Sequence, residues 1–389
     1  MEFVNEIKNE LVNHMIPFWN SMRDDECGGY YGFLSENIEL NKDYPKGCIL
    51  NSRILWFYSN AYALLKDEKL KDNARHAYEF LRDHFLDEKE GGVYWSVDRE
   101  GNPVDDSKHT YCQAFAIYGL ASYYAITDDD EDVLYLAYEL FDVIEQRMRD
   151  EGGYLEAFNR DFTPASNEKL SENGVMATRT MNTLLHVLEA YTELYRVDQA
   201  LNVKDRIEEM LGIFTKHMVN YDLGRQEVFF DHDYNTLIDL YSYGHDIETS
   251  WLLDRTLDVL KEKEYTDKVR PILHTIGENI LDRAFDGNAL YNEAENGQID
   301  HRRIWWVQCE SIIGFTNMYQ ATKDEKYLDA AKSIWNFTNE YIIDKREGAE
   351  WHSELTGENV VITTKPIVDE WKCPYHNGRM CIEMINRLG

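Results

Sequence analysis

The sequence is short of basic residues relative to its acidic ones. Forty lysines and arginines stand against 72 aspartates and glutamates, a formal net charge of −32 at pH 7. A field of that sign repels phosphate backbones and anionic lipid surfaces, so we expect neither nucleic acid nor a membrane as a partner. A neutral small molecule such as a sugar is compatible with it.

Long apolar runs are also missing. No stretch reaches the roughly 18 apolar residues of a membrane-spanning helix. The first ten residues mix charged and apolar side chains, which is unlike the uninterrupted apolar core of a secretory signal. We therefore expect the protein in the cytoplasm.

Cysteine motifs and flexible linkers are scarce. The six cysteines include no C-x-x-C pair, and in a reducing compartment they are expected to be free thiols. With seven prolines and no long Gly/Ser/Pro segment, the chain offers no obvious boundary between domains. We expect one domain over residues 1–389, acting as a monomer.

What is present is a repeat. Short segments that are rich in glycine and aromatic residues recur at intervals of about 60 residues, which makes six units. The segments are GGYYGF at 28–33, GGVYW at 91–95, GGYLEAF at 152–158, VFF at 228–230, GNALY at 287–291 and GAEW at 348–351.

Apolar residues between these segments return at helical spacing and predict twelve helices. In one helix of each pair the residues are small, aromatic or isolated polar, and the other helix is amphipathic with a charged face. Six such hairpins bury their apolar faces by closing on one another, which predicts an all-α (α/α)6 barrel with short β-strands capping one mouth. The expected pairs are 3–22 and 51–66, 74–87 and 111–124, 133–148 and 179–196, 203–219 and 245–262, 266–284 and 306–321, and 324–343 and 376–387.

Polar residues near the mouth of the inner helices are the candidates for a pocket, because a pocket there draws on many segments. Candidates three or four positions apart share one helix face, so both can reach the same cavity. The candidates are Arg53, Tyr111, Asn182 with His186, His245 with Glu248 and Trp251, Trp306 with Glu310, and His376.

His245 stands out among them. It follows Gly244 at a helix start, and Glu248 lies one turn further on, where a carboxylate can hold the tautomer of an imidazole and raise its basicity. A lone histidine such as His186 is more often structural than catalytic. Glu248 and Glu310 are also compatible with the acid and base of a glycosidase, which is found on the same barrel.

Four segments resemble those of cellobiose 2-epimerases, within the N-acylglucosamine 2-epimerase superfamily. They follow the same order at near-equal spacing, so the resemblance covers the whole chain, and the superfamily shares the (α/α)6 barrel. The segments are NSRILWFY at 51–58, SYGHDIETSW at 242–251, WWVQCE at 305–310 and WKCPYHNGR at 371–379.

The resemblance implies an isomerase that inverts C2 of the reducing-end glucose of a disaccharide such as cellobiose, giving glucosyl-mannose. His245 and His376 would be the acid and base, Glu248 would orient His245, and Arg53 would face the oxygens on C1 and C2. The sugar would contact Tyr111, Asn182, His186, Trp251, Trp306 and Glu310, and Trp371 would stack on the second sugar.

Inversion at C2 needs an open ring, because only the free aldehyde makes the C2 proton acidic enough to remove. Two histidines suit the step, since a pKa near 6.5 lets each act as acid or base. We expect no cofactor and no metal, because Arg53 and the histidines meet the enediolate charge and the inner helices show no compact cluster of histidines and carboxylates.

The sequence is also compatible with other functions. They are an N-acylglucosamine 2-epimerase or mannose isomerase of the same superfamily, a glycoside hydrolase on the same barrel, and a carbohydrate-binding protein without chemistry. The preferred disaccharide, any aldose–ketose side activity and the identity of the abstracting histidine are also open.

Overall fold

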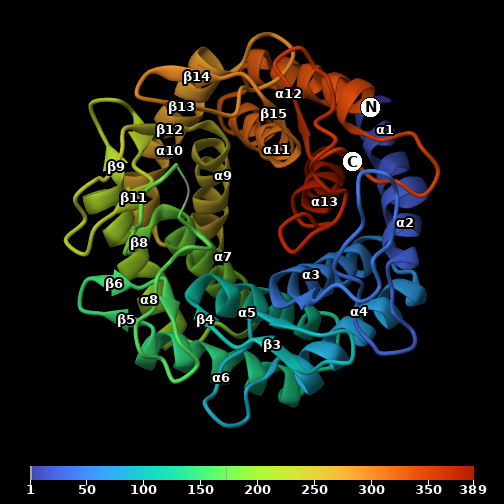
Figure 1. Cartoon of the computed structure of the whole chain (residues 1–389). Helices are drawn as coiled ribbons and strands as arrows, with labels where there is room; N and C mark the ends of the chain where they lie inside the picture. The colour runs from blue at the N-terminus through green and yellow to red at the C-terminus, as the bar shows by residue number, and fades with distance from the viewer. Residues whose placement is uncertain (1, 172) are drawn as a thin grey trace.

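Six helices form an inner ring in the computed structural model, which describes residues 2–171 and 173–389 (Figure 1). Each inner helix contacts the next, and the last contacts the first, so the ring is closed. The inner helices are α3 (Cys48–Leu65), α5 (Thr110–Tyr124), α7 (Met181–Asp198), α9 (Tyr243–Leu260), α11 (Trp305–Thr322) and α13 (His376–Leu388).

An outer ring surrounds them (Figure 1). Its first member joins α1 (Glu2–Glu10) to α2 (Ile16–Ser21) through a π-helical turn, η1 (Leu11–Met15), and α1 packs beside α13 near the carboxyl end of the chain. Three further π-helical turns, η2 (Leu81–Phe85), η3 (Phe214–Met218) and η4 (Thr338–Ile342), extend outer helices. The other outer helices are α4 (Glu68–Phe80), α6 (Glu131–Arg147), α8 (Leu201–Ile213), α10 (Lys263–Ala284) and α12 (Glu325–Phe337).

The predicted (α/α)6 barrel is confirmed, and the contrast between the rings follows the sequence. Almost every residue of α5 is buried, whereas α4 buries one face only. Two-residue corners join α3, α7, α9 and α11 to the outer helices that follow them. In the first, Lys66 takes the left-handed conformation that ends α3, and the Asp67 side chain caps α4 by accepting from the Lys69 amide. Within the described residues, no helix has the length and apolar character needed to cross a membrane.

The predicted boundaries differ from the observed ones by a few residues. Helix α7 begins at Met181 instead of residue 179, because Arg179 and Thr180 pair as a strand. Helix α3 begins at Cys48, three residues before the predicted start. Hydrophobic periodicity does not mark where either helix begins, because the strand residues before it and the helix residues after it are equally buried.

Short antiparallel ladders link neighbouring units at the end where the inner helices begin. A strand that leads into one inner helix pairs with a strand of the next unit. The ladders join β1 (Lys46–Gly47), β2 (Ser96–Val97) and β3 (Pro103–Asp105); β4 (Lys108–His109) and β7 (Ala157–Phe158); β8 (Arg179–Thr180) and β11 (Phe229–Phe230); β12 (Leu240–Ser242), β13 (Glu293–Glu295) and β14 (Gln298–Asp300); and β15 (Arg303–Ile304) and β16 (Glu354–Leu355). Two hairpins, β5 (Arg149–Asp150) with β6 (Gly153–Tyr154) and β9 (Val219–Asn220) with β10 (Arg225–Gln226), complete the strands.

A buried ion pair recurs at this end of the barrel. In four units an aspartate before the glycine-aromatic segment binds a lysine or arginine two residues before the inner helix. In one of them the Lys108 Nζ lies 3.1 Å from the Asp87 carboxylate, and both side chains are fully buried. The four pairs are Asp24 with Lys46, Asp87 with Lys108, Asp150 with Arg179, and Asp286 with Arg303.

The glycine-aromatic segments are held by polar side chains of the inner helices. The Gln113 amide accepts from the Val93 amide at 2.7 Å and donates back to the Val93 carbonyl at 3.0 Å. Gln308 makes the same pair of bonds to Leu290. Gly92 must be a glycine, because its φ is +72° and a Cβ would lie 2.8 Å from the Gln113 oxygen. The repeated motif is therefore the docking point between a loop and its inner helix.

Lys108→Met tests the structural role of the ion pairs. Removing one partner of a buried pair leaves the other charge uncompensated, so we expect a loss of about 3 kcal/mol in the free energy of unfolding, measured by urea denaturation. Lys263→Met is the matched control, because Lys263 pairs with Asp267 at the exposed surface, where such pairs contribute little. Equal losses in the two variants would contradict this interpretation.

Candidate active site

A cavity of about 550 Å³ opens between the inner helices at the end where the strands lie. Nine of the eleven residues predicted for the site line it, so most of the predicted site lies in one cavity. The nine are Arg53 of α3, Tyr111 of α5, Asn182 and His186 of α7, His245 and Glu248 of α9, Trp306 of α11, and Trp371 and His376 from the last unit.

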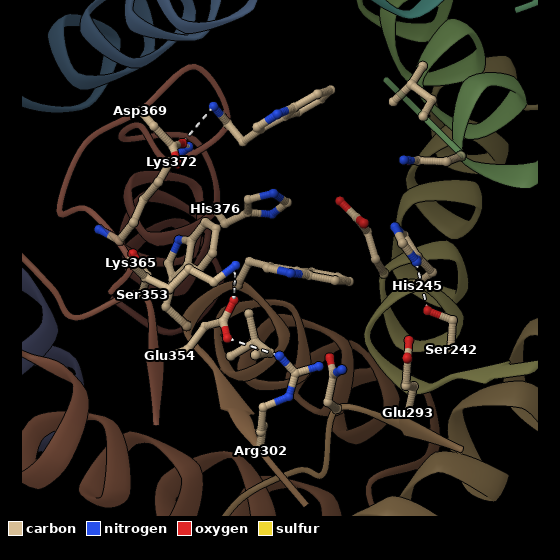
Figure 2. A pocket seen from close by; sticks show the side chains of 18 of the residues that line it. Ser242, His245, Glu293, Arg302, Ser353, Glu354, Lys365, Asp369, Lys372 and His376 are labelled. Carbon is tan, nitrogen blue, oxygen red and sulfur yellow. Dashed lines mark hydrogen bonds and ion pairs between the residues drawn. The ribbon is translucent and has the colours of Figure 1, made fainter. Parts of the chain in front are cut away.

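Two imidazoles point into this cavity from different walls (Figure 2). The Trp306 ring lies close to both, with its centroid 4.8 Å from that of His245 and 5.5 Å from that of His376. Gly244 makes this possible, because a Cβ at that position would lie 2.5 Å from the Trp306 ring. Both imidazoles are therefore within reach of a ligand that stacks on Trp306.

The partner of His245 differs from the expected one. Its Nδ1 lies 2.7 Å from the Ser242 hydroxyl, and the Glu248 carboxylate accepts instead from the Arg379 guanidinium. Ser242 is the last residue of strand β12 and directly precedes α9. The prediction that Glu248 directly orients His245 is therefore wrong, although Glu248 does line the cavity.

The structure also changes the expected places of Glu310 and Trp251. Both are buried behind the cavity wall instead of facing a ligand. Glu310 accepts from the Trp251 indole at 2.9 Å and lies 2.7 Å from His376 Nδ1. Glu310 thus holds His376, and Trp251 holds Glu310, so direct contact of either with a sugar is not supported.

Arg379 is the central residue that sequence reasoning missed. Its guanidinium, 1% exposed, donates to Glu310 at 2.7 Å and also to Glu248 and Glu189. Glu189 in turn lies 2.9 Å from His186 Nδ1. The sequence signals for it were its place three residues after His376, one helical turn along the same face, and its position at the end of the WKCPYHNGR segment.

Arg53 is also held in place by several neighbouring groups. It donates to the Tyr111 hydroxyl at 2.8 Å and to the Trp371 carbonyl at 3.0 Å. Its guanidinium lies 4.1 Å from the Phe115 ring centroid and 4.4 Å from that of Tyr375. Arg53 is therefore a fixed cation at the cavity wall.

Burial and neighbouring charges shift the pKa values of the site. Burial lowers the pKa of His245 to about 3, with His186 adding to the effect. Burial also lowers the pKa of His376 well below its usual value, and Arg53 and Arg379 act in the same direction. Burial and the nearby Glu310 raise the pKa of Glu248 to about 7. Both imidazoles are therefore neutral near pH 7 in the free protein.

A compact cluster of carboxylates and histidine does exist, contrary to the sequence-based expectation. Ligand atoms of Glu248, Glu310 and His376 lie within 4.8 Å of one another, close enough for a metal ion. However, one nitrogen of Arg379 hydrogen bonds to both carboxylates. The guanidinium thus already supplies a positive charge to this cluster.

Loops supply the outer part of the cavity, which sequence reasoning did not anticipate. Glu354 of β16 lies between Arg302 and Lys365, 3.1 Å from each (Figure 2). Lys169 and Asn173, from the segment between β7 and β8, also line the cavity. These residues lie outside any helical periodicity, so no spacing rule could have found them.

Asp246, next to His245 in sequence, provides a pH test of these burial effects. Burial raises its pKa to about 8, whereas an aspartate in an unfolded chain has a pKa of about 3.9. The folded protein keeps a proton that the unfolded chain loses between these values, so this group lowers stability as pH rises from about 4 to about 8. We expect Asp246→Asn to gain stability relative to the parent protein between pH 5 and pH 8 in urea unfolding. Asp258→Asn, at an exposed aspartate, is the control, and its difference in unfolding free energy from the parent should not change with pH. A difference that does not change with pH in Asp246→Asn would contradict the expectation.

Several known proteins are similar to this chain over most of its length. The model of the N-acylglucosamine 2-epimerase family matches residues 28–377. A cellobiose 2-epimerase of Ruminococcus albus is 51% identical, covering 99% of this chain and 98% of its own. The solved structure of cellobiose 2-epimerase from Bacillus thermoamylovorans has a TM-score of 0.95 at 44% identity, covering 100% of both chains. A D-mannose isomerase of Marinomonas mediterranea is 22% identical over 94% of this chain and 92% of its own.

The family match covers all six glycine-aromatic segments and includes every one of the residues that line the two-histidine cavity from the inner helices. The chain therefore belongs to the N-acylglucosamine 2-epimerase family.

Proposed function

We propose that this protein is a cellobiose 2-epimerase, which converts cellobiose and related β-1,4-linked disaccharides with a reducing-end glucose to the 2-epimer. The observation that carries the proposal is the pair of imidazoles, His245 and His376, that both lie beside Trp306 in one cavity. The high identity to cellobiose 2-epimerases, against 22% to a mannose isomerase, supports the disaccharide over the monosaccharide alternatives.

The chemistry follows from this geometry. One histidine, as the neutral base, removes the C2 proton of the open-chain sugar. The other takes up a proton from solvent and gives it to the opposite face of the planar enediolate, and the first then releases its proton to solvent. Because both imidazoles are neutral when free, either can take the first proton, which suits a reversible reaction. Glu310 beside His376 Nδ1 fixes the orientation of that ring, so His376 is also placed for proton transfer at the ring oxygen.

Arg53 meets the negative charge that develops on the C1 and C2 oxygens. A buried, fixed cation needs no reorganisation when that charge appears, and stabilisation of this kind contributes several kcal/mol in enzymes, about 3 per lost donor. Tyr111, Asn182 and His186 line the same region and offer hydrogen bonds to the sugar hydroxyls. Trp306 stacks on the reducing-end ring and Trp371 on the second sugar.

A glycoside hydrolase is disfavoured by the position of the carboxylates. A glycosidase needs two carboxyl groups that flank the scissile bond. Glu310 is completely buried and is bound by Trp251, His376 and Arg379. It therefore has no access to a glycosidic oxygen.

We further propose that catalysis is metal-independent, because the Arg379 guanidinium already hydrogen bonds to the Glu248 and Glu310 carboxylates and places a cation beside them. The whole chain, residues 1–389, would act as one catalytic domain, as a monomer and without a cofactor. The cytoplasm is the proposed location, in keeping with six cysteines that are all free thiols.

Incubation with cellobiose in deuterated water tests the reaction. We expect glucosyl-mannose with deuterium at C2, identified by NMR and mass spectrometry, since the removed proton exchanges with solvent. Glucose as the product would indicate a hydrolase, and an unchanged sugar would indicate a binding protein. His376→Asn should lose turnover and keep the parent melting temperature within a few degrees; an active His376→Asn would contradict its assigned role.

Arg379→Lys tests the role of the buried guanidinium. Lysine keeps the charge but cannot bridge Glu189, Glu248 and Glu310, so we expect kcat to fall roughly tenfold to 100-fold, as when groups that orient catalytic ligands are removed. Arg255→Lys is the matched control, because Arg255 also joins α9 to α7, but through Glu193, which binds no histidine of the site. If the two variants lose the same activity, Arg379 has no special function.

A further inference from the structure

The indole of Trp371 is supported from behind by a second tryptophan. Trp95, the last residue of the GGVYW segment, is 3% exposed, and its ring centroid lies 5.6 Å from that of Trp371 in an edge-to-face arrangement. Trp95 is not among the residues that line the cavity, although Trp371 is. Trp95 therefore contacts Trp371 without facing a ligand.

Trp95 is itself held on several sides. Its indole nitrogen donates to Glu370 at 2.9 Å, and Glu370 directly precedes Trp371 in the chain. The Trp95 backbone binds the Asp105 carbonyl at 3.0 Å and the Cys48 amide at 2.9 Å. The position of Trp95 is thus set by the ladder of β1, β2 and β3 and by the start of α3.

Two further side chains enclose the Trp95 ring. The His109 imidazole lies 4.8 Å away between centroids, and the Lys169 ammonium lies 4.9 Å from the ring centroid. Lys169 also pairs with Asp105 at 2.6 Å. Trp95 is therefore enclosed by one histidine, one lysine and Trp371, and has little room to change rotamer.

Trp371 has separate supports for its backbone and for its ring. The backbone carbonyl accepts from Arg53 at 3.0 Å, and the backbone amide donates to Asp369 at 2.9 Å. The ring packs on Trp95 and, at 5.9 Å, on Tyr111. Loss of Trp95 would loosen the indole while leaving the link between Trp371 and Arg53 in place.

We propose that Trp95 is a positioning residue for disaccharide specificity, because it holds the indole of Trp371 in the place where the second sugar stacks. The inference rests on the proposed function and deepens it. Trp95 makes no contact with His245, His376 or Trp306 among the ring contacts of the described residues, so the reducing-end position does not depend on it.

Binding measurements on Trp95→Phe test the inference. Dissociation constants for cellobiose and for mannose are measured by calorimetry with Trp95→Phe in the His376→Asn protein, so that turnover does not interfere. We expect the constant for cellobiose to rise about fivefold to tenfold, in line with the worth of an aromatic pair. The constant for mannose, which fills only the reducing-end position, should stay within about twofold of that of the parent, because the change lies at the second sugar. Glu370→Ala, which removes the acceptor of the indole, should show the same selective loss.

Trp335→Phe is the matched control. Trp335 is 1% exposed and also donates to a glutamate, Glu6, at 2.9 Å, but in the outer ring. It should lose similar stability and bind both sugars as the parent does. Equal weakening of cellobiose and mannose in Trp95→Phe, or no weakening of either, would overturn the role of Trp95. Failure of the unsubstituted protein to epimerise cellobiose would instead count against the proposed function.

Discussion

The site depends on one buried guanidinium. Arg379 of α13 reaches carboxylates on α7, α9 and α11, namely Glu189, Glu248 and Glu310. A buried charge without partners would cost several kcal/mol, so this set is stable only when all four helices are in place. Although burial would raise it, Arg379 and His186 lower the pKa of Glu189 to about 2, which keeps that carboxylate ionised. Closure of the inner ring and assembly of the site are therefore the same event.

The same network sets the directions of two imidazoles. Glu310 binds His376 and Glu189 binds His186, in each case at Nδ1, and this leaves Nε2 free to face the cavity. His245 has a hydroxyl partner, Ser242, instead of a carboxylate. The two proposed acid–base groups thus differ in environment, because His376 has a carboxylate partner and His245 has a hydroxyl partner. A reaction in which a proton leaves one face of a carbon and a proton returns to the opposite face can use this asymmetry.

Sequence periodicity predicted the ring, its order and most of the site, because helical spacing determines which residues share a face. It could not tell how deep a residue lies or which residue of another helix it meets. Glu248 and Glu310 both occupied plausible positions by spacing, yet one lines the cavity and the other is buried behind it. Arg379 was overlooked for the same reason, since its three partners lie 69 to 190 residues away in the chain.

The last unit departs from the repeat where the chemistry is concentrated. In four units a strand with a buried lysine or arginine leads into the inner helix, but α13 follows Tyr375 without such a strand. Its buried pair is instead Lys372 with Glu350, and Glu350 also binds Trp19 and Asn377. The residues that a strand would occupy are thereby free to place Trp371 beside the cavity and His376 at the first turn of α13. The first five units, each with a strand that leads into its inner helix, build the wall of the site, and the sixth positions Trp371 and His376 in it.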